Sequence, residues 1–301
     1  MSLNIEKFIK KLAEAGYKAS AKETLITQGW LLVNSRPAQR IPGLLLLGPA
    51  GAGKTFFIEC LAKALGGTLI SYQCHYGTGK EELLYDLDIK GVVEKLSGGK
   101  EDASYLRPGV LPQAIQRANE NKAERRPVFL LLDEIDKTRP EVDAFLLAFL
   151  QSGHIYDPHL GNFILEEEAK LYVCATSNQE RLLSEPLMRR FRRVYCKYPP
   201  AEVEAEIISR ACPEAHPAFV KGLVSVASWL RKRDDIIKPP STPELINIVR
   251  DILLLDDPEA RAEIVLSWLT AYEEDRSIIE EKYPRSWWVG MLQDKDIKRG
   301  I

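Results

Sequence analysis

The residues best suited to chemistry form one short stretch, Gly48-Pro49-Ala50-Gly51-Ala52-Gly53-Lys54-Thr55. It fits the pattern G-x-x-x-x-G-K-S/T at every fixed position. Glycines let backbone N–H groups approach a phosphate chain, and the start of a following helix adds the positive end of its dipole. Lys54 can reach the β- and γ-phosphates, and Thr55 offers a hydroxyl to Mg²⁺. A plain glycine-rich turn is the disfavoured alternative, so this phosphate loop predicts binding of a nucleoside triphosphate.

A second group of reactive residues follows the apolar run 128–132, which reads as a strand buried on both faces. The run ends in Asp133-Glu134-Ile135-Asp136. Asp133 is placed to bind Mg²⁺ directly or through water, and Glu134 can orient or polarise an attacking water. An acidic loop after a core strand is the alternative. Because the phosphate loop comes earlier in the chain, a plain acidic loop is the disfavoured alternative here. We therefore expect a nucleotide-hydrolysis site.

Two further candidates are more ambiguous. Asn178 follows a predicted strand at 170–175, and ligands of open α/β sheets sit at the carboxyl ends of strands. An asparagine in an ordinary turn is equally compatible with this position. Arginines 189, 190, 192 and 193 flank Phe191. They fit either a solvated basic helix end or an arginine presented to a phosphate bound by a neighbouring subunit.

The elements that position these residues alternate between strands and helices. Pro199-Pro200 marks a domain boundary, beyond which only helical patterns follow. The predicted fold class is therefore α/β, a P-loop NTPase parallel five-stranded sheet sandwiched by helices, followed by a smaller all-α domain. Thr138 and Glu141 fit a capping box before a helix at 142–151. The expected strands are 43–47, 68–73, 128–132, 170–175 and 194–198, and the later helices are about 201–211, 216–232, 243–255 and 258 into the 270s. The expected domains are an N-terminal helical segment, 1–40, a core, 41–199, with hairpin insertions near 91–107 and 154–168, and a helical region, 200–301.

Composition fits a globular protein: 45% of the 301 residues are hydrophobic and 28% are charged. The net charge of −2 gives no global electrostatic case for nucleic acid or an acidic membrane. No apolar run is long enough to span a membrane, and the N-terminus lacks a signal-peptide core. The five cysteines form no C-x-x-C and the four histidines show no ligand spacing. We therefore expect free thiols in a reducing, cytoplasmic compartment and no structural zinc.

Taken together, these motifs resemble those of AAA+ ATPases, and most of all the MoxR/dynein-related branch, over about residues 40–255. The stretch from Gln73 to Asp86 also looks like the nitric-oxide-reductase and Rubisco activase-type members of the MoxR group. The resemblance implies an ATPase that hydrolyses ATP with Mg²⁺ in a ring, a homo-hexamer, and acts as a chaperone on a protein client. It also implies a partner with a von Willebrand factor A domain. By the same resemblance Asn178 is the sensor-1 residue, Arg190 is an arginine finger acting in trans, with Arg189 as the fallback, and the helical region is the lid.

Three positions are not explained by the resemblance alone. The lid helix of this branch carries an arginine after a Ser-Pro or Thr-Pro pair, whereas Glu244 follows Thr242-Pro243 here, and a carboxylate would be repelled by a triphosphate. Tyr76 lies in a connection that commonly faces the ring pore; it either grips a client or packs against the first insertion. Trp287-Trp288 is interpreted as packing rather than as a cofactor site.

Two other functions compete with this prediction. The first is a nucleic-acid-coupled motor like the GTPase of the McrB restriction system or the MCM helicases. Clustered lysines on the insertions would favour it, but the first holds Lys95 and Lys100 and an acidic run, Glu166-Glu167-Glu168, follows the second, so nucleic acid is not favoured. The other is a slow nucleotide-dependent assembly module. ATP is preferred to GTP through the resemblance alone.

Overall fold

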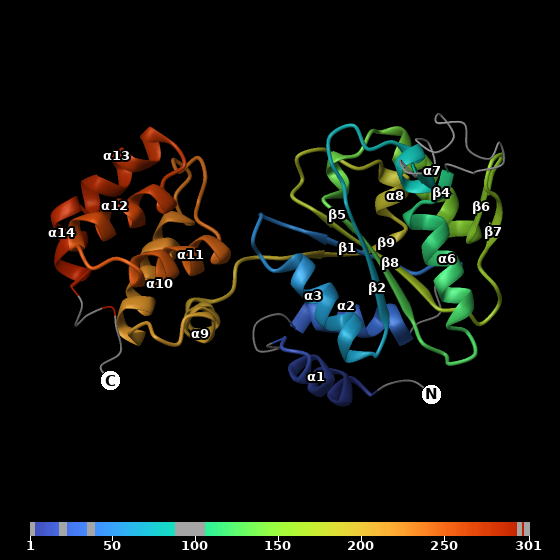
Figure 1. Ribbon diagram of the computed structural model, residues 1–301, viewed down its shortest axis with the longest axis horizontal. Helices are drawn as coiled ribbons and strands as arrows, with labels where there is room; N and C mark the ends of the chain where they lie inside the picture. The colour runs from blue at the N-terminus through green and yellow to red at the C-terminus, as the bar shows by residue number, and fades with distance from the viewer. Residues whose placement is uncertain (1–3, 18–22, 35–39, 88–105, 294–296, 298–301) are drawn as a thin grey trace, which may run out of the picture. The chain divides into compact units, whose positions relative to one another are not determined.

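The computed structural model describes residues 4–17, 23–34, 40–87, 106–293 and 297. The chain divides into two compact units, Met1–Pro49 with Gly53–Cys196, and Ala50–Ala52 with Lys197–Ile301. Figure 1 shows the strands in the first unit and helices α9 to α14 in the second. Of the described helices, none is long and apolar enough to cross a membrane. All five cysteines are buried and free of disulfides.

The first unit is built on a five-stranded sheet in the order β2-β5-β8-β1-β9. Every neighbouring pair is parallel, which confirms the predicted five-stranded parallel sheet. The last strand was predicted too late, because the pairing with β1 runs from Gly43 opposite Phe191 to Leu47 opposite Tyr195. The buried Phe191 packs where Gly43 has no side chain. The strands are β1 Gly43–Leu47, β2 Thr68–Gln73, β5 Val128–Asp133, β8 Leu171–Ser177 and β9 Phe191–Tyr195.

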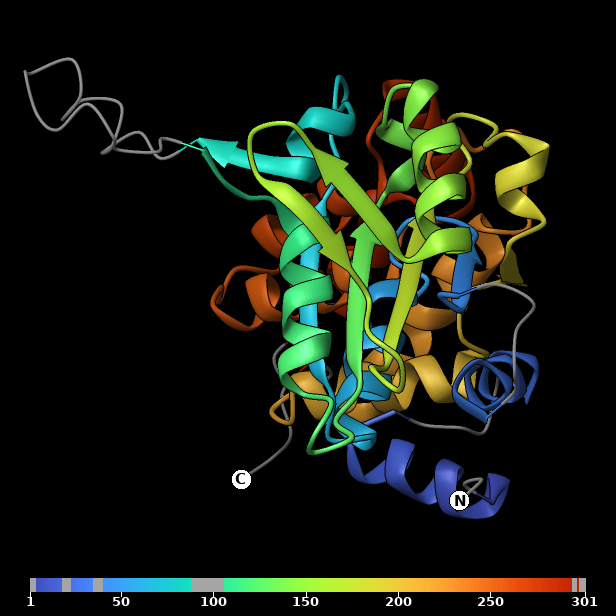
Figure 2. The ribbon, with the colours of Figure 1, turned by 90° about the vertical axis from the view of Figure 1, so that its right-hand side faces the viewer.

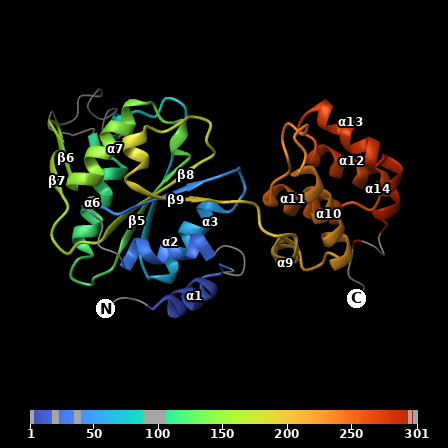
Figure 3. The same ribbon diagram turned by 180° about the vertical axis from the view of Figure 1, so that it is seen from behind.

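Helices cover both faces of this sheet, which explains why its central strands are apolar throughout. Successive side chains of β5 point to opposite faces, and the five from Val128 to Leu132 are all buried. Figure 2 shows α6 and α7 on one side of the sheet, and Figure 3 shows α2 and α3 on the other. The helix α1 packs on α3. These helices are α1 Ile5–Glu14, α2 Glu23–Asn34, α3 Lys54–Ala64, α6 Val110–Glu120 and α7 Glu141–Ser152.

Two small antiparallel pairs lie outside the main sheet. The strands β6, His154–Asp157, and β7, Gly161–Ile164, form the hairpin that was expected near 154–168. After α4, Lys80–Leu84, the strand β3, Tyr85–Leu87, pairs with β4, Leu106–Pro108. The rest of the hairpin expected near 91–107, up to residue 105, lies outside the described residues.

The capping box predicted at Thr138 is wrong. Pro140 is the N-cap of α7, with no side-chain hydrogen bond to the helix. The Thr138 hydroxyl instead donates to Ile135 O at 2.8 Å, and so closes the short helix η2, Ile135–Lys137. The sequence pattern therefore marked the end of one turn, two residues before the N-cap of the next helix.

The second unit holds six helices among its described residues. The helix expected from 258 into the 270s ends at Leu269, because Thr270 leaves the helical region with φ −125° and ψ 104°. Trp288 is fully buried in the core of this unit, and Trp287 lies against it with ring centroids 4.9 Å apart. The helices are α9 Ala201–Ala211, α10 Pro217–Leu230, α11 Thr242–Leu253, α12 Pro258–Leu269, α13 Glu273–Lys282 and α14 Arg285–Met291.

Candidate nucleotide-binding and hydrolysis site

The candidate site lies at the carboxyl edge of the sheet, where three adjacent parallel strands end together. The strand β8 lies between β5 and β1. Its residue Ser177 pairs with Leu47 at the end of β1, and Ala175 pairs with Leu132 near the end of β5. The phosphate loop, Asp133 and Asn178 therefore leave the sheet side by side, as expected for ligand-binding residues of an open α/β sheet.

The backbone of the phosphate loop has the conformation that its glycines allow. Gly48, Gly51 and Gly53 have φ of 137°, 70° and 80°. A Cβ on Gly48 would lie 2.1 Å from Cys196 O, so a side chain is excluded there. Gly53 is the N-cap of α3 and provides no side-chain cap, which leaves the first N–H groups of that helix available to an anion. Ala50–Ala52, the middle of the loop, group with the second unit.

Lys54 lies inside the loop and is 6% exposed. Its Nζ donates to Gly48 O at 2.7 Å, to Pro49 O at 2.8 Å and to Asn178 Oδ1 at 2.8 Å. Burial lowers the pKa of this ammonium, an effect that Cys196 and the carboxylates of Asp133, Asp136 and Glu134 oppose. The structure thus joins Lys54 and Asn178, which the sequence separates by 124 positions.

Thr55 and Asp133 also meet at this edge. Thr55 Oγ1 lies 3.0 and 3.1 Å from the two carboxylate oxygens of Asp133, and Thr176 Oγ1 also donates to Asp133. Hydroxyl and carboxylate oxygens suit Mg²⁺, which takes one or two protein ligands and completes its shell with phosphates and water. No cluster of three or more His, Cys, Asp or Glu that could hold a metal occurs in the described part of the chain. The pair Thr55 and Asp133 therefore fits a magnesium ion bound together with phosphate.

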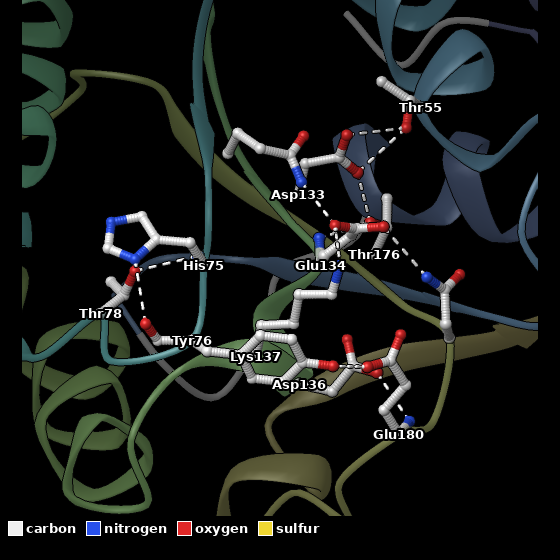
Figure 4. A network of polar contacts seen from close by, with 12 residues as sticks. Thr55, His75, Tyr76, Thr78, Asp133, Glu134, Asp136, Lys137, Thr176 and Glu180 are labelled. Carbon is white, nitrogen blue, oxygen red and sulfur yellow. Dashed lines mark hydrogen bonds and ion pairs between the residues drawn. The ribbon is translucent and has the colours of Figure 1, made fainter.

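Glu134 turns away from the direction of Asp133 because its backbone is left-handed, with φ 56° and ψ 50°. A non-glycine residue in this region costs of the order of 1–3 kcal/mol. Its N–H donates to Thr176 Oγ1 at 2.9 Å, which helps to fix the turn. Its side chain lies at the centre of Figure 4.

Three donors contact the carboxylate of Glu134. Asn178 Nδ2 donates to Oε1 at 3.1 Å. Gln73 Nε2 and Lys137 Nζ both donate to Oε2, each at 2.8 Å. Asn178 therefore bridges Lys54 and Glu134, so the structure brings together three of the four predicted catalytic residues.

Gln73, Lys137 and Thr176 were missed by the sequence analysis as residues of the site. A signal existed for Gln73, which ends β2 opposite Asp133 and therefore reaches the same edge of the sheet. Lys137 follows Glu134 by three residues, but only the turn η2 brings its ammonium back to the carboxylate. That turn has no distinctive sequence pattern.

Arg190 does not join this group within one chain. It precedes β9, whose first residue pairs with Gly43, so it lies at the amino edge of the sheet. The phosphate loop follows Leu47 at the opposite edge, four strand residues or about 13 Å away along β1. The fallback candidate, Arg189, pairs on the surface with Glu185.

Glu244 has a local role in the second unit. Its Oε2 accepts bonds from the backbone N–H and the hydroxyl of Ser241, both at 2.7 Å, which closes a capping box on α11. Lys238 Nζ lies 3.1 Å from Oε1. Burial alone would raise the pKa of Glu244, but these hydrogen bonds hold it below the ordinary value of 4.5. The pattern S-x-x-E was visible in the sequence, and it accounts for a glutamate at this position.

Comparison with known proteins shows which domain family this core resembles. Residues 43–191 match the family model of the AAA domain, dynein-related subfamily. This span includes the phosphate loop, the acidic pair, Asn178 and Arg190. Over this span the first unit is similar to the AAA domain of the dynein-related subfamily, and its five-stranded parallel sheet was predicted from the sequence.

The proteins with similar sequences include ones named as an ATPase and as a chaperone. A proteasome-associated ATPase of Gordonia bronchialis is 27% identical over 188 residues, which cover 60% of this chain and 29% of the relative. The chaperone protein ClpB 2 of Parasynechococcus marenigrum is 26% identical over 222 residues, 71% of this chain and 21% of the relative. The chain thus spans less than a third of either relative. A solved structure of a RuvB mutant from Thermotoga maritima aligns with this chain at 16% sequence identity and a TM-score of 0.45. The alignment covers 93% of this chain and 71% of that one.

Proposed function

We propose that this protein is a MoxR-like AAA+ ATPase that hydrolyses ATP with Mg²⁺ in an oligomeric ring to remodel or activate a protein client. The observation that carries the proposal is the bridge formed by Asn178 between Lys54 and Glu134. An ammonium, an amide and a carboxylate are thereby in contact at one edge of the sheet. This is the arrangement that phosphoryl transfer to water needs.

Each residue has a role that follows from its chemistry. The loop N–H groups and Lys54 bind the phosphates, and Thr55 and Asp133 hold the metal. Mg²⁺ neutralises charge on the phosphate oxygens when it is bound. Asn178 positions the attacking water, and Glu134 accepts its proton. Lys54 must release Gly48 O and Pro49 O to contact a phosphate, which is a short movement for a flexible side chain.

The position of Arg190 supports a ring. It lies at the opposite edge of the sheet from its own phosphate loop, so within one chain it is too far away to complete that site. An arginine supplied in trans stabilises charge on the transferred phosphoryl group. We infer a closed homo-oligomer, a hexamer, in which each site is completed by the next subunit.

The remaining parts of the proposal rest on the resemblance and on the relatives. These parts are a protein client, a partner with a von Willebrand factor A domain, the helical region as a lid, a cytoplasmic location, and ATP rather than GTP. A slow nucleotide-dependent assembly module is a second candidate, favoured by the three donors that occupy the carboxylate of Glu134. Rates with and without a client would separate a motor from an assembly module.

Binding and hydrolysis are tested separately with two variants. Lys54→Ala should abolish binding of ATP, because it removes the main positive charge on the phosphates. Glu134→Gln should retain binding and lose turnover, because the loop and Asp133 are unchanged. Calorimetric titration with ATP and GTP, together with phosphate release, gives both quantities. Turnover at the wild-type rate in Glu134→Gln would remove Glu134 from the mechanism.

A further inference from the structure

The chain between β8 and β9 joins two parts of the proposed site. It begins with Asn178, at the carboxyl edge of the sheet, and ends with Arg190, which we propose acts on the next subunit. We call residues 178–190 the β8–β9 connection. It contains one short helix, α8, Glu185–Met188. Whatever fixes the path of this connection therefore also fixes where the arginine is presented.

One buried carboxylate bonds to the β8–β9 connection at two places. Asp143 lies in the first turn of α7 and is 3% exposed. Its two oxygens accept from the guanidinium of Arg181, from Nη2 at 2.9 Å and from Nη1 at 3.2 Å. Its Oδ2 also accepts from the backbone N–H of Ser184 at 2.5 Å. Ser184 is the N-cap of α8, so Asp143 holds the residue from which that helix starts.

Other contacts anchor the connection on either side of this carboxylate. Before it, the N–H of Glu180 donates to Asp136 Oδ2 at 2.8 Å (Figure 4). Nη2 of Arg181 also donates to Thr138 Oγ1 at 3.1 Å. After it, Leu187 of α8 is fully buried in the apolar core of the first unit. The connection is therefore bonded first to the segment that follows β5 and then to the core.

The contacts of α8 differ in what they can fix. Burial of Leu187 sets how deep the helix lies but not which way it faces, because the hydrophobic effect is non-directional. A hydrogen bond weakens steeply as its angle closes, so the bond from Ser184 to Asp143 is directional. The helix has four residues, little more than one turn. Arg190 follows directly, with its N–H bonded to Leu187 O at 2.9 Å, so a rotation of α8 would carry the arginine with it.

Stability alone does not account for a charged pair at this position. Replacing a buried ion pair by well-packed apolar residues is often neutral or stabilising. The pair of Asp143 and Arg181 instead provides geometry, because a bidentate contact between guanidinium and carboxylate adds specificity to its energy. Arg181 and Ser184, which provide the three bonds described above, both belong to the β8–β9 connection. The directional contacts of this carboxylate thus converge on the segment that carries Arg190.

We propose that Asp143 is a positioning residue that sets where α8 begins and thereby where Arg190 is presented to the site of the next subunit. The inference rests on the proposed ring ATPase and names a residue on which its shared site depends. It assigns to Asp143 an effect on the neighbour's site rather than on the site of its own chain. That direction can be measured.

The test begins with Asp143→Asn, which keeps the size of the side chain and removes the charge. The affinity for ATP should be unchanged, and turnover should fall about a hundredfold, the effect of a misplacement of about 1 Å. In the Arg190→Ala background the same change should add nothing, because it acts through that arginine. Asp157→Asn is the matched control. Asp157 is 6% exposed and accepts from two backbone N–H groups, those of His159 and Leu160, after β6, so turnover should stay as in the wild type.

Mixed rings show on which subunit Asp143 acts. Lys54→Ala subunits supply an intact arginine to Asp143→Asn subunits, which keep their own phosphate loop. Turnover should recover to about a quarter of the wild-type value, the share of complete interfaces in a random equal mixture. Mixing with Arg190→Ala subunits should restore nothing, because both kinds then lack a well-placed arginine. Recovery with Arg190→Ala alone would show that Asp143 serves its own site, and recovery with neither partner would show a general defect; either result overturns the inference.

A second variant covers the case in which thermal unfolding shows that Asp143→Asn does not fold. Arg181→Lys keeps a cation beside Asp143 but cannot form the bidentate pair. It should lower turnover by less and recover with the same partner, Lys54→Ala. If Arg190→Ala is slow while Asp143→Asn and Arg181→Lys match the wild type, the inference fails and the ATPase proposal stands. If the wild type binds ATP without hydrolysing it, the proposed function fails as well.

Discussion

The proposal that each site is shared between two subunits gives the sharpest prediction for this protein. Arg190→Ala removes the arginine that we propose acts in trans and leaves the whole carboxyl edge of the sheet intact. The variant should bind ATP nearly as the wild type does. Its turnover should fall on the order of a thousandfold, the contribution typical of an arginine finger. Arg117→Ala, which breaks an exposed pair with Glu120 on α6, is the control and should have no effect.

Rings that mix two inactive variants give a second quantitative prediction for turnover. Arg190→Ala subunits keep Lys54, and Lys54→Ala subunits keep Arg190. A site is complete where a neighbour of the second kind supplies its arginine to a subunit of the first kind. In a random equal mixture this occurs at about one interface in four of a cyclic ring, so turnover should recover to about a quarter of the wild-type value.

The assay is phosphate release from mixed rings whose composition is verified by sizing and mass. Each variant alone should be nearly inactive. Absence of recovery in verified mixed rings would refute the shared site. Recovery through Arg189→Ala rather than Arg190→Ala subunits would instead transfer the role to the neighbouring arginine. Full activity of Arg190→Ala alone would show that one chain is sufficient.

Three further predictions concern the metal and the second unit. Asp133→Asn should remove most of the difference in ATP affinity between Mg²⁺ and EDTA, measured by titration calorimetry, because one carboxylate ligand is lost. Glu244→Gln keeps an acceptor for the capping box and removes the charge, so it should destabilise the helical unit in urea unfolding by about 1 kcal/mol at most. Since the pKa of Glu244 is lowered in the folded protein, this stabilisation exists above pH 4.5 and is lost as pH falls through the folded value, so the wild type and variant should converge in acid. Arg231→Met should cost about 3–5 kcal/mol, because it leaves the fully buried Glu204 without its partner at 2.7 Å; an unchanged unfolding midpoint would contradict this.

The parts of the site that the sequence predicted are those that depend on local spacing. The phosphate loop needs fixed intervals between its glycines and Lys54, and Asp133-Glu134 directly ends an apolar strand. Both patterns can be recognised in the sequence because a single strand and the turn after it place these residues. The central strands β1, β5 and β8 were predicted for a related reason: a strand covered by helices on both faces is buried along almost its whole length.

The contacts that were missed depend on register and on competition for the same hydrogen bonds. Gln73 reaches Glu134 because β2 pairs with β5, a fact that apolar patterning does not encode. Thr138 fits a capping box, but its hydroxyl instead donates to Ile135 O and accepts from Arg181. The last strand begins at Phe191, inside an arginine-rich segment, since a buried phenylalanine can pack over Gly43.

The geometry leads us to expect that an isolated subunit turns over ATP slowly. The proposed base, Glu134, is held by Lys137, Gln73 and Asn178, and the proposed finger lies at the far edge of the sheet. Both features would lower turnover in an isolated subunit, by different means. Assembly would supply the arginine and leave the contacts on Glu134 in place, because those contacts lie within one chain. Mixed rings of Arg190→Ala and Lys54→Ala subunits should therefore recover only what the arginine contributes.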